Sequence, residues 1–174
     1  MSFLDEYKFY TPAPPCTKRI AELATELYHE CINKGVGNPF VPGRLQEIIM
    51  AGALGHRISD TLSGADGYDE RGACEYKTTI DKNISGTYSS ISVQASWDEQ
   101  VEYLSQKFGN MNHYIGRFES GSLIEVWMLD GDKVIELITP SIYKQFTNPS
   151  HRKDPRFSTN ICMTDIYKHG VRII

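Results

Sequence analysis

The segment from Gly64 to Ile80, which reads GADGYDERGACEYKTTI, most constrains what this chain of 174 residues can fold into. Within it, residues 69–72 have the composition of a tight turn, because Asp favours the first position of a type I turn and Gly the last. Short runs on both sides predict a β-hairpin. If the two central turn residues form the loop, Asp66 lies directly across from Glu75, whereas a bulge at the turn's glycine would shift this pairing by one residue.

The period of two in the second strand places two charged side chains together. Glu75 and Lys77 share one face of this strand, about 7 Å apart. The same triplet, Glu-Tyr-Lys, occurs at residues 6–8, but without a turn or a partner acid, so we interpret that copy as a solvated segment. The alternate positions of the strand, which we expect to pack inward, are Cys74, Tyr76, Thr78 and Ile80.

Two carboxylates and a lysine on one hairpin suit metal-dependent chemistry on a phosphate. Carboxylate oxygens are ligands that Mg²⁺ prefers. The metal would polarise a phosphoryl oxygen and activate a bound water, and Lys77 would orient that water and stabilise negative charge on the phosphate. The alternative is a surface ion pair that only stabilises the hairpin, by about 0.2–1 kcal/mol.

Helical periodicity dominates the first 60 residues. Apolar spacing predicts one helix over residues 17–33, with Thr17 as its N-cap after a proline-rich stretch, and a second helix over residues 44–56. Glu47 is predicted to lie roughly opposite the apolar face of the second helix, at about 100° per residue. That apolar face comprises Leu45, Ile48, Ile49 and Gly52.

After residue 63 the hydrophobic period is mostly that of strands. We expect an α/β (α+β) fold in one domain over residues 1–174, with a mixed central β-sheet flanked by helices. The elements expected beyond the first hairpin are a helix over 96–108, a hairpin over 112–129, a strand over 133–138, a helix over 140–146, an irregular polar loop over 148–160 and strand-like residues over 161–174.

Composition indicates an ordinary globular chain. Hydrophobic residues make up 40% and charged residues 23%, which shows no sign of disorder. No apolar run approaches the roughly 20 residues that span a bilayer, and the N-terminal residues lack the apolar core of a secretory signal. The four cysteines are widely spaced without a CxxC pair, which suits reduced thiols. We therefore expect a cytoplasmic protein without a membrane partner.

Charge is unevenly distributed along the chain. The net charge is −4, yet residues 144–174 carry six basic side chains against two acidic ones. A locally positive C-terminal part is compatible with a nucleic-acid partner, although a solvated polar face is the more usual meaning of such a charge distribution.

The stretch GADGYDERGACEYK resembles the metal-binding signature of the PD-(D/E)XK nuclease superfamily, in the variant that lacks the proline. The order of a helical N-terminal part, an acid, a short hairpin, E-x-K and a polar segment is similar to that of small homodimeric type II restriction endonucleases. The closing IYKHGVRII is similar to the ending of such an enzyme. The resemblance runs loosely from about residue 44 to the C-terminus and implies a restriction-endonuclease-like core with a helical N-terminal part.

Carried over residue by residue, the resemblance implies that Asp66 and Glu75 are metal ligands and that Lys77 is the catalytic lysine. Tyr76 would contribute only its backbone carbonyl to the metal. The implied cofactor is Mg²⁺, for which Mn²⁺ can substitute. Many members of the superfamily place a further acid on the preceding helix, where Glu47 is the candidate accessory acid; an exposed helical glutamate is the alternative.

A polar segment, SGTYSSISVQ, follows the catalytic strand, where a similar enzyme carries histidines that contact DNA bases. Ser, Thr and Gln side chains can also contact base edges, although a polar strand facing water is the alternative. A second polar cluster near the C-terminus is a candidate for contacts to phosphates or bases. The candidate DNA-binding residues are Lys82, Tyr88, Ser89, Ser90, Ser92, Gln94, Asn148, His151, Arg152 and Asn160.

The resemblance therefore implies a Mg²⁺-dependent, sequence-specific double-strand DNA endonuclease that acts on a short palindromic site. A homodimer would match such a site by its two-fold symmetry, and residues 17–60 are the candidates for the dimer contact. Its functional counterpart would be a cognate DNA methyltransferase in a restriction-modification system. The alternatives are another nuclease of the superfamily, mismatch-nicking or junction-resolving, and a non-catalytic nucleic-acid-binding module.

Overall fold

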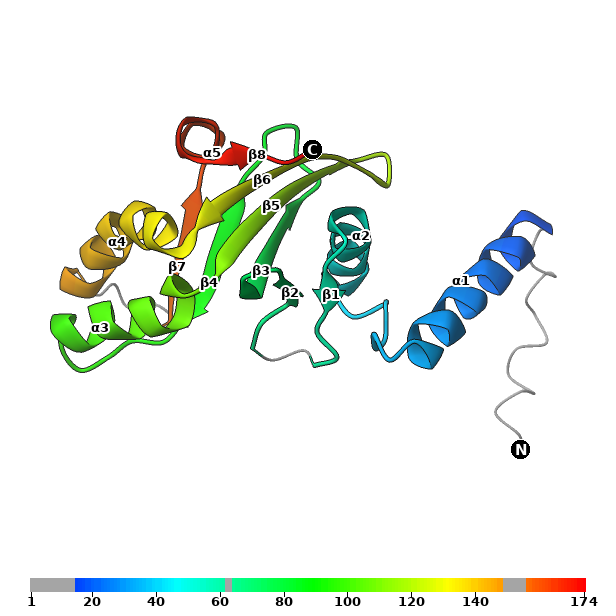
Figure 1. Ribbon diagram of the computed structural model, residues 1–174, viewed down its shortest axis with the longest axis horizontal. Helices are drawn as coiled ribbons and strands as arrows, with labels where there is room; N and C mark the ends of the chain where they lie inside the picture. Colours follow the sequence, from blue (N-terminus) through cyan, green and yellow to red (C-terminus); the bar gives the residue numbers. More distant parts are fainter. Residues whose placement is uncertain (1–14, 62–63, 149–155) are drawn as a thin grey trace, which may run out of the picture.

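A mixed six-stranded sheet lies at the centre of the computed structural model, which describes residues 15–61, 64–148 and 156–174 (Figure 1). Its strand order is β1-β2-β3-β5-β6-β8, and β3 and β5 are parallel while all other neighbours are antiparallel. A second, two-stranded antiparallel sheet pairs β4 with β7. The strands are β1 (Arg57–Ile58), β2 (Gly67–Asp69), β3 (Gly72–Thr79), β4 (Gly86–Ile91), β5 (Asn112–Glu119), β6 (Ser122–Asp130), β7 (Phe157–Ile161) and β8 (Val171–Arg172).

Helices lie on both sides of the central sheet, with α2 on one side and α3 and α4 on the other (Figure 1). The predicted α/β (α+β) class, with a mixed central sheet flanked by helices, is confirmed. No helix in the described ranges is long and apolar enough to cross a membrane. The helices are α1 (Pro15–Asn33), α2 (Arg44–Leu54), α3 (Trp97–Leu104), the π-helical turn η2 (Ser105–Gly109), α4 (Gly131–Thr147) and α5 (Met163–His169).

Each face of the sheet has its own hydrophobic core. Between α2 and the sheet, Met50 and Ala51 pack against Cys74, Tyr76 and Tyr114. The larger core lies on the other face, where β4, β7, α3, α4 and α5 contribute buried side chains. Because side chains alternate along a strand, β3 sends Cys74 and Tyr76 toward α2 and places Glu75 and Lys77 on the opposite side.

The two predicted hairpins are confirmed, as β2–β3 and β5–β6. The helix expected over 96–108 is also present, as α3 followed by η2. Its N-cap is Ser96, whose side chain accepts a hydrogen bond from the backbone N–H of Glu99. These elements could be predicted from the sequence because helix caps and tight turns depend on residues that are neighbours in the sequence.

The strand predicted over 133–138 and the helix predicted over 140–146 are wrong, because α4 spans both. Asp130 caps this helix by accepting a hydrogen bond from the backbone N–H of Lys133 at 2.8 Å. Val134, Ile138 and Ile142 then follow at intervals of four residues and are all buried. Pro140 lies inside the helix on its exposed side, where the carbonyl left without its usual donor can face water.

The C-terminal part also differs from the expectation. Residues 161–174 were expected to be strand-like, but seven of them form the short helix α5 and only two form β8. The loop expected over 148–160 contains most of strand β7. Residues 149–155 lie outside the described ranges.

The N-terminal helix α1 lies apart from the sheet (Figure 1). It begins at Pro15, so Thr17 lies inside the helix and the prediction that Thr17 is its N-cap is wrong. Among its described side chains, residues 17–33, Cys31 alone is buried. Ile20 is 63% exposed and Leu23 is 47% exposed, so the apolar face that predicted this helix is uncovered in the monomer.

Gly131, the first residue of α4, gives a test of the packing between α4 and η2. A Cβ atom at this position would overlap the backbone carbonyl oxygens of Phe108 and Gly109. We expect Gly131→Ala to lower the free energy of unfolding by about 2–4 kcal/mol. Gly52→Ala is the matched control, because Gly52 lies within α2 and has open space around it; it should raise stability by about 0.5–1 kcal/mol. Urea denaturation measures both, and a tolerated Gly131→Ala would contradict the packing.

Candidate active site

The turn between β2 and β3 determines which residues face each other. The Asp69 carboxylate accepts hydrogen bonds from the backbone N–H groups of Arg71, at 2.8 Å, and Gly72, at 3.0 Å. Gly72 has a φ of 130°, which favours glycine. Asp69 pairs with Gly72 and Gly67 with Cys74, so the predicted two-residue loop, without a bulge at Gly72, is confirmed. The regular pairing ends at Gly67, and the N–H of Asp66 bonds to the carbonyl of Cys74, so Asp66 lies next to this end of the pairing and not in a regular pair with Glu75.

The carboxylate of Asp66 lies where β2 and β3 diverge. Its Oδ2 atom accepts a hydrogen bond from the backbone N–H of Tyr76 at 2.8 Å, and its own N–H donates to the carbonyl of Cys74 at 3.1 Å. The N–H and C=O of one residue in an extended strand point to the same side. The carbonyl of Tyr76 therefore also points toward the side on which Asp66 lies.

Glu75 and Lys77 share the face of β3 that is turned away from α2, as predicted. Their side chains form a direct ion pair between Glu75 Oε1 and Lys77 Nζ. Both side chains are partly exposed, at 18% and 20%. Solvent, or a ligand, can therefore reach Glu75 and Lys77, and Asp66 is likewise only partly buried.

Glu47 does not lie opposite the packed face of α2, so that prediction is wrong. The packed face of α2 includes Arg44 and Ala51, which are both buried. Glu47 lies three residues after Arg44 and four residues before Ala51, so it lies on the same side of the helix. Its side chain is 21% exposed and pairs with Arg44 at 3.1 Å. The prediction failed because the expected apolar face included Gly52, which is exposed, and did not include Arg44, which is buried.

Burial and two neighbouring negative charges act on Asp66. Burial raises the pKa of Asp66, and the charges of Glu75 and Glu47 raise it further, to about 7; the Tyr76 N–H and Lys77 act in the opposite direction. The carboxylates therefore repel one another in a partly desolvated place. A divalent cation bound there would relieve this repulsion.

The oxygen atoms at this place fit a magnesium ion in type. Mg²⁺ is commonly bound by one or two carboxylates and keeps several waters. Asp66, Glu75 and the carbonyl of Tyr76 supply oxygen donors only. Within residues 15–61, 64–148 and 156–174, no three His, Cys, Asp or Glu side chains are grouped closely enough to hold a metal. Two carboxylates with water are therefore the arrangement that the described residues offer.

A buried tyrosine and histidine lie beneath the ion pair. Tyr88 is only 1% exposed, so its predicted contact with DNA is wrong. Its ring centroid lies 5.5 Å from Lys77 Nζ, and its hydroxyl lies 3.2 Å from His113 Nδ1. His113 Nε2 lies 3.0 Å from the carbonyl of Phe108. Because a carbonyl can only accept, Nε2 carries the hydrogen, and Nδ1 accepts from the Tyr88 hydroxyl.

His113 stays neutral in this position. It is fully buried, and burial lowers its pKa below the ordinary histidine value. Sequence reasoning missed His113 because it becomes a neighbour of Glu75 only through the parallel pairing of β3 with β5. No local pattern indicates that pairing.

The remaining candidate DNA-binding residues are mostly exposed. Gln94 is half-buried, and its amide donates to the carbonyl of Ser92 at 3.3 Å. His151 and Arg152 lie outside the described ranges. The exposed candidates are Lys82, Ser89, Ser90, Ser92, Asn148 and Asn160.

Strands β4 and β7 form a two-stranded sheet, the β4–β7 ribbon, which brings two of the predicted polar segments together. Thr87 pairs with Asn160 across the ribbon, and the Thr87 hydroxyl donates to Asn160 Oδ1 at 3.3 Å. The register shifts between Tyr88 and Ile91, where Ser90 has a φ of 57°. The ribbon therefore presents polar side chains that are about seventy residues apart in the sequence.

Comparison with known proteins does not assign the chain to a family. No family model matches the sequence, and no curated protein is significantly similar to it. A functional assignment therefore depends on the residues and their geometry.

The raised pKa of Asp66 predicts the pH dependence of stability without metal. Because about 7 lies above the ordinary value of 3.8, the folded chain binds this proton more tightly, and stability decreases as pH rises from about 4 to about 8. Asp66→Asn removes the charge. We expect this variant to be more stable than the wild type at pH 8, by on the order of 2–4 kcal/mol, and to lose the advantage near pH 4. Chemical denaturation across this pH range measures the difference.

Asp69→Asn is the matched control with the opposite sign. Burial raises the pKa of Asp69, but hydrogen bonds from Asn112, Arg71, Tyr114 and Gly72 outweigh it and bring the pKa below 3.8. Asp69→Asn should therefore be less stable than the wild type at pH 8, and the loss should shrink as pH falls below about 4. If both variants lose stability at pH 8, the repulsion at Asp66 is contradicted.

Proposed function

We propose that the chain is a Mg²⁺-dependent, sequence-specific double-strand DNA endonuclease of the type II restriction class, with the restriction-endonuclease-like core that the sequence resemblance implies. It hydrolyses phosphodiester bonds at a short palindromic site. The observation that carries the proposal is the meeting of Asp66, Glu75 and Lys77 at the divergent end of the β2–β3 hairpin, where Asp66 has a raised pKa. Such a site carries more negative than positive charge, which a divalent cation would balance, and the side chains of Glu75 and Lys77 are partly exposed.

The chain's own residues have distinct roles in this proposal. Asp66, Glu75 and the carbonyl of Tyr76 would hold the Mg²⁺ ion, which supplies a Lewis acid for the phosphoryl oxygen and a water of lowered pKa. Lys77 orients the attacking water and stabilises the negative charge that develops on the phosphate. Tyr88 limits where the Lys77 side chain can lie, because its ring packs near the ammonium group.

The β4–β7 ribbon supports recognition of double-stranded DNA. A two-stranded ribbon fits the width of the major groove. The exposed residues Ser89 and Asn160 lie on this ribbon, whereas the candidate site lies on the six-stranded sheet. The locally positive C-terminal part of the sequence supports contact with phosphates.

Helix α1 supports a homodimer. Its exposed apolar face needs a partner, since a helix without tertiary packing is marginally stable in water. Lys18 and Arg19 lie near its start and Glu26 and Glu30 near its end, so an antiparallel pair of α1 helices would place opposite charges side by side. A two-fold dimer matches a palindromic site. In this proposal the enzyme is cytoplasmic and acts alongside a cognate DNA methyltransferase.

The direct ion pair between Glu75 and Lys77 favours one alternative, a non-catalytic nucleic-acid-binding module, because a purely structural hairpin would show the same pair. Metal binding distinguishes the two. A structural ion pair gains nothing from Mg²⁺, whereas a nuclease site is stabilised by it.

Digestion of unmethylated phage DNA with Mg²⁺ tests the activity. We expect discrete bands that disappear with EDTA, and cleavage slowed by about 10²–10⁴-fold in Lys77→Ala and Asp66→Ala. Glu70→Gln is the matched control, because Glu70 is an exposed acid on the same hairpin, and it should cleave like the wild type. A smear would indicate a less specific nuclease, mismatch-nicking or junction-resolving. Absence of cleavage with both Mg²⁺ and Mn²⁺ would refute the proposal.

The oligomeric state tests the role of α1. We expect the wild type to be a dimer in light scattering and Leu23→Asp to be a monomer, because the charge would lie in the apolar contact. Thr25→Asp adds the same charge on the polar face of α1 and should remain a dimer. A monomeric wild type would exclude α1 as a dimer contact.

A further inference from the structure

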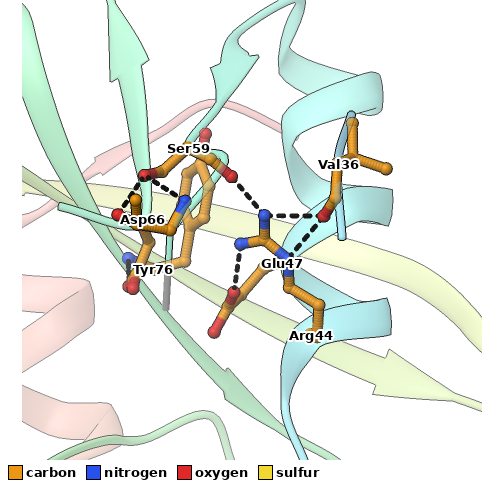
Figure 2. Close-up of polar contacts among 7 residues, drawn as sticks. Val36, Arg44, Glu47, Ser59, Asp66 and Tyr76 are labelled. Atoms are coloured by element: carbon orange, nitrogen blue, oxygen red, sulfur yellow. Dashed lines mark hydrogen bonds and ion pairs between the residues drawn. The ribbon is translucent and has the colours of Figure 1, made fainter. Parts of the chain in front are cut away.

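A buried arginine joins three parts of the chain beside the candidate site. Arg44, the first residue of α2, is 1% exposed, and Figure 2 shows its polar contacts. Its Nε and Nη2 atoms donate to the carbonyl of Val36, at 3.0 and 2.8 Å, and Nη2 also donates to the carbonyl of Ser59. Its Nη1 atom donates to Glu47 Oε2 at 3.1 Å. A buried cation with this many directed contacts restricts all of its partners.

The contacts continue from Arg44 to Asp66 through the backbone. Ser59, whose carbonyl accepts from Arg44, donates its own N–H to the carbonyl of Asp66 at 2.9 Å. On its other side, Asp66 is held by the backbone of β3. Figure 2 shows this path from Val36 through Arg44 and Ser59 to Asp66. Hydrogen bonds therefore connect Arg44 to the backbone of Asp66 through Ser59.

Arg44 also determines where Glu47 lies. The ion pair holds the Glu47 carboxylate on the packed side of α2, close enough to Asp66 for its charge to act there. Without Arg44, a glutamate in the first turn of a helix would extend into water. One guanidinium thus positions two carboxylates.

We propose that Arg44 is a positioning residue of the candidate site, which holds Glu47 beside Asp66 and makes the position of Asp66 depend on the segment that follows α1. This inference rests on the proposed function for the metal site and for the dimer contact of α1. Val36 lies just beyond α1, so a change in how α1 packs is transmitted through the guanidinium to Ser59 and Asp66. The dimer contact and the metal site are in this way mechanically linked.

The planar geometry of arginine is essential to this role. Its guanidinium presents up to five N–H donors in fixed directions, whereas a lysine offers one ammonium at the end of a flexible chain. Arg44→Lys therefore keeps the charge but cannot bond Val36, Ser59 and Glu47 together. Arg57→Lys is the matched control, because Arg57 is exposed, lies two residues from Ser59 and stacks on Tyr68 at 4.0 Å without contact to Asp66.

Native-state amide hydrogen exchange is the first measurement, since it needs neither metal nor activity. In Arg44→Lys we expect the amides of Ser59 and Tyr76 to exchange at least about tenfold faster relative to core amides of β5 and β6, and no such local change in Arg57→Lys. A uniform acceleration of all amides would show that Arg44 acts only on global stability, and would overturn the proposal.

Calorimetry with Mg²⁺ alone gives the second measurement. Residues that orient metal ligands typically change affinity by about 10–100-fold, so we expect Arg44→Lys to raise the Mg²⁺ dissociation constant by about tenfold and to lower kcat more than it changes KM. Glu47→Gln should weaken binding in the wild-type background and add little to Arg44→Lys. An unchanged dissociation constant in both single variants would overturn the role of Arg44 toward the site.

Two outcomes separate this inference from the proposed function. If the wild type binds no Mg²⁺ while exchange at Ser59 and Tyr76 still depends on Arg44, the positioning role stands and the metal-dependent nuclease is refuted. If Arg44→Lys does not fold, Glu47→Gln removes one charged partner of Arg44 without deleting the guanidinium. Unchanged Mg²⁺ affinity in Glu47→Gln then overturns the inference.

Discussion

The carboxylate of Asp69 accepts four hydrogen bonds, and the rest of the candidate site depends on them. Two come from the backbone of its own turn and two from β5, where Asn112 Nδ2 donates at 2.7 Å and the Tyr114 hydroxyl at 2.9 Å. The turn is therefore fixed both locally and against the next strand of the sheet. A slip of one residue would move every side chain of β3 to the opposite face. Asp69 thus determines that Glu75 and Lys77 are turned away from α2 while Tyr76 is turned toward it.

Charges of both signs meet in a small, partly buried volume around Asp66. Lys77 is paired with Glu75 and Arg44 with Glu47, which leaves Asp66 as the carboxylate whose pKa burial and its neighbours raise. Such an arrangement costs stability in the folded chain and is typical of sites that bind a cation or transfer a proton. The neutral His113 and Tyr88 beneath β3 add hydrogen bonds without adding charge. The electrostatic imbalance is therefore concentrated where a ligand can relieve it.

Local sequence patterns were sufficient for the parts of the fold that local physics controls. The β2–β3 hairpin followed from its turn residues, and α3 followed from its apolar spacing after residue 96. The strand predicted over residues 133–138 was wrong because their nearly continuous apolar run is compatible with either a strand or a helix. The Asp130 cap and the four-residue spacing of Val134, Ile138 and Ile142 decided for the helix.

The sequence by itself determined Asp66, Glu75 and Lys77 as a group, because a two-residue loop and a period of two set their relation within 12 consecutive residues. Only the tertiary structure decided that Tyr88 is buried, that His113 lies beside Glu75, and that Arg44 is a buried cation holding Glu47. Each of these depends on contacts between distant segments, and burial of a charge is settled by the partners that the fold supplies. A residue type read alone predicts the opposite: arginine is usually exposed, and a glutamate on a helix usually faces water.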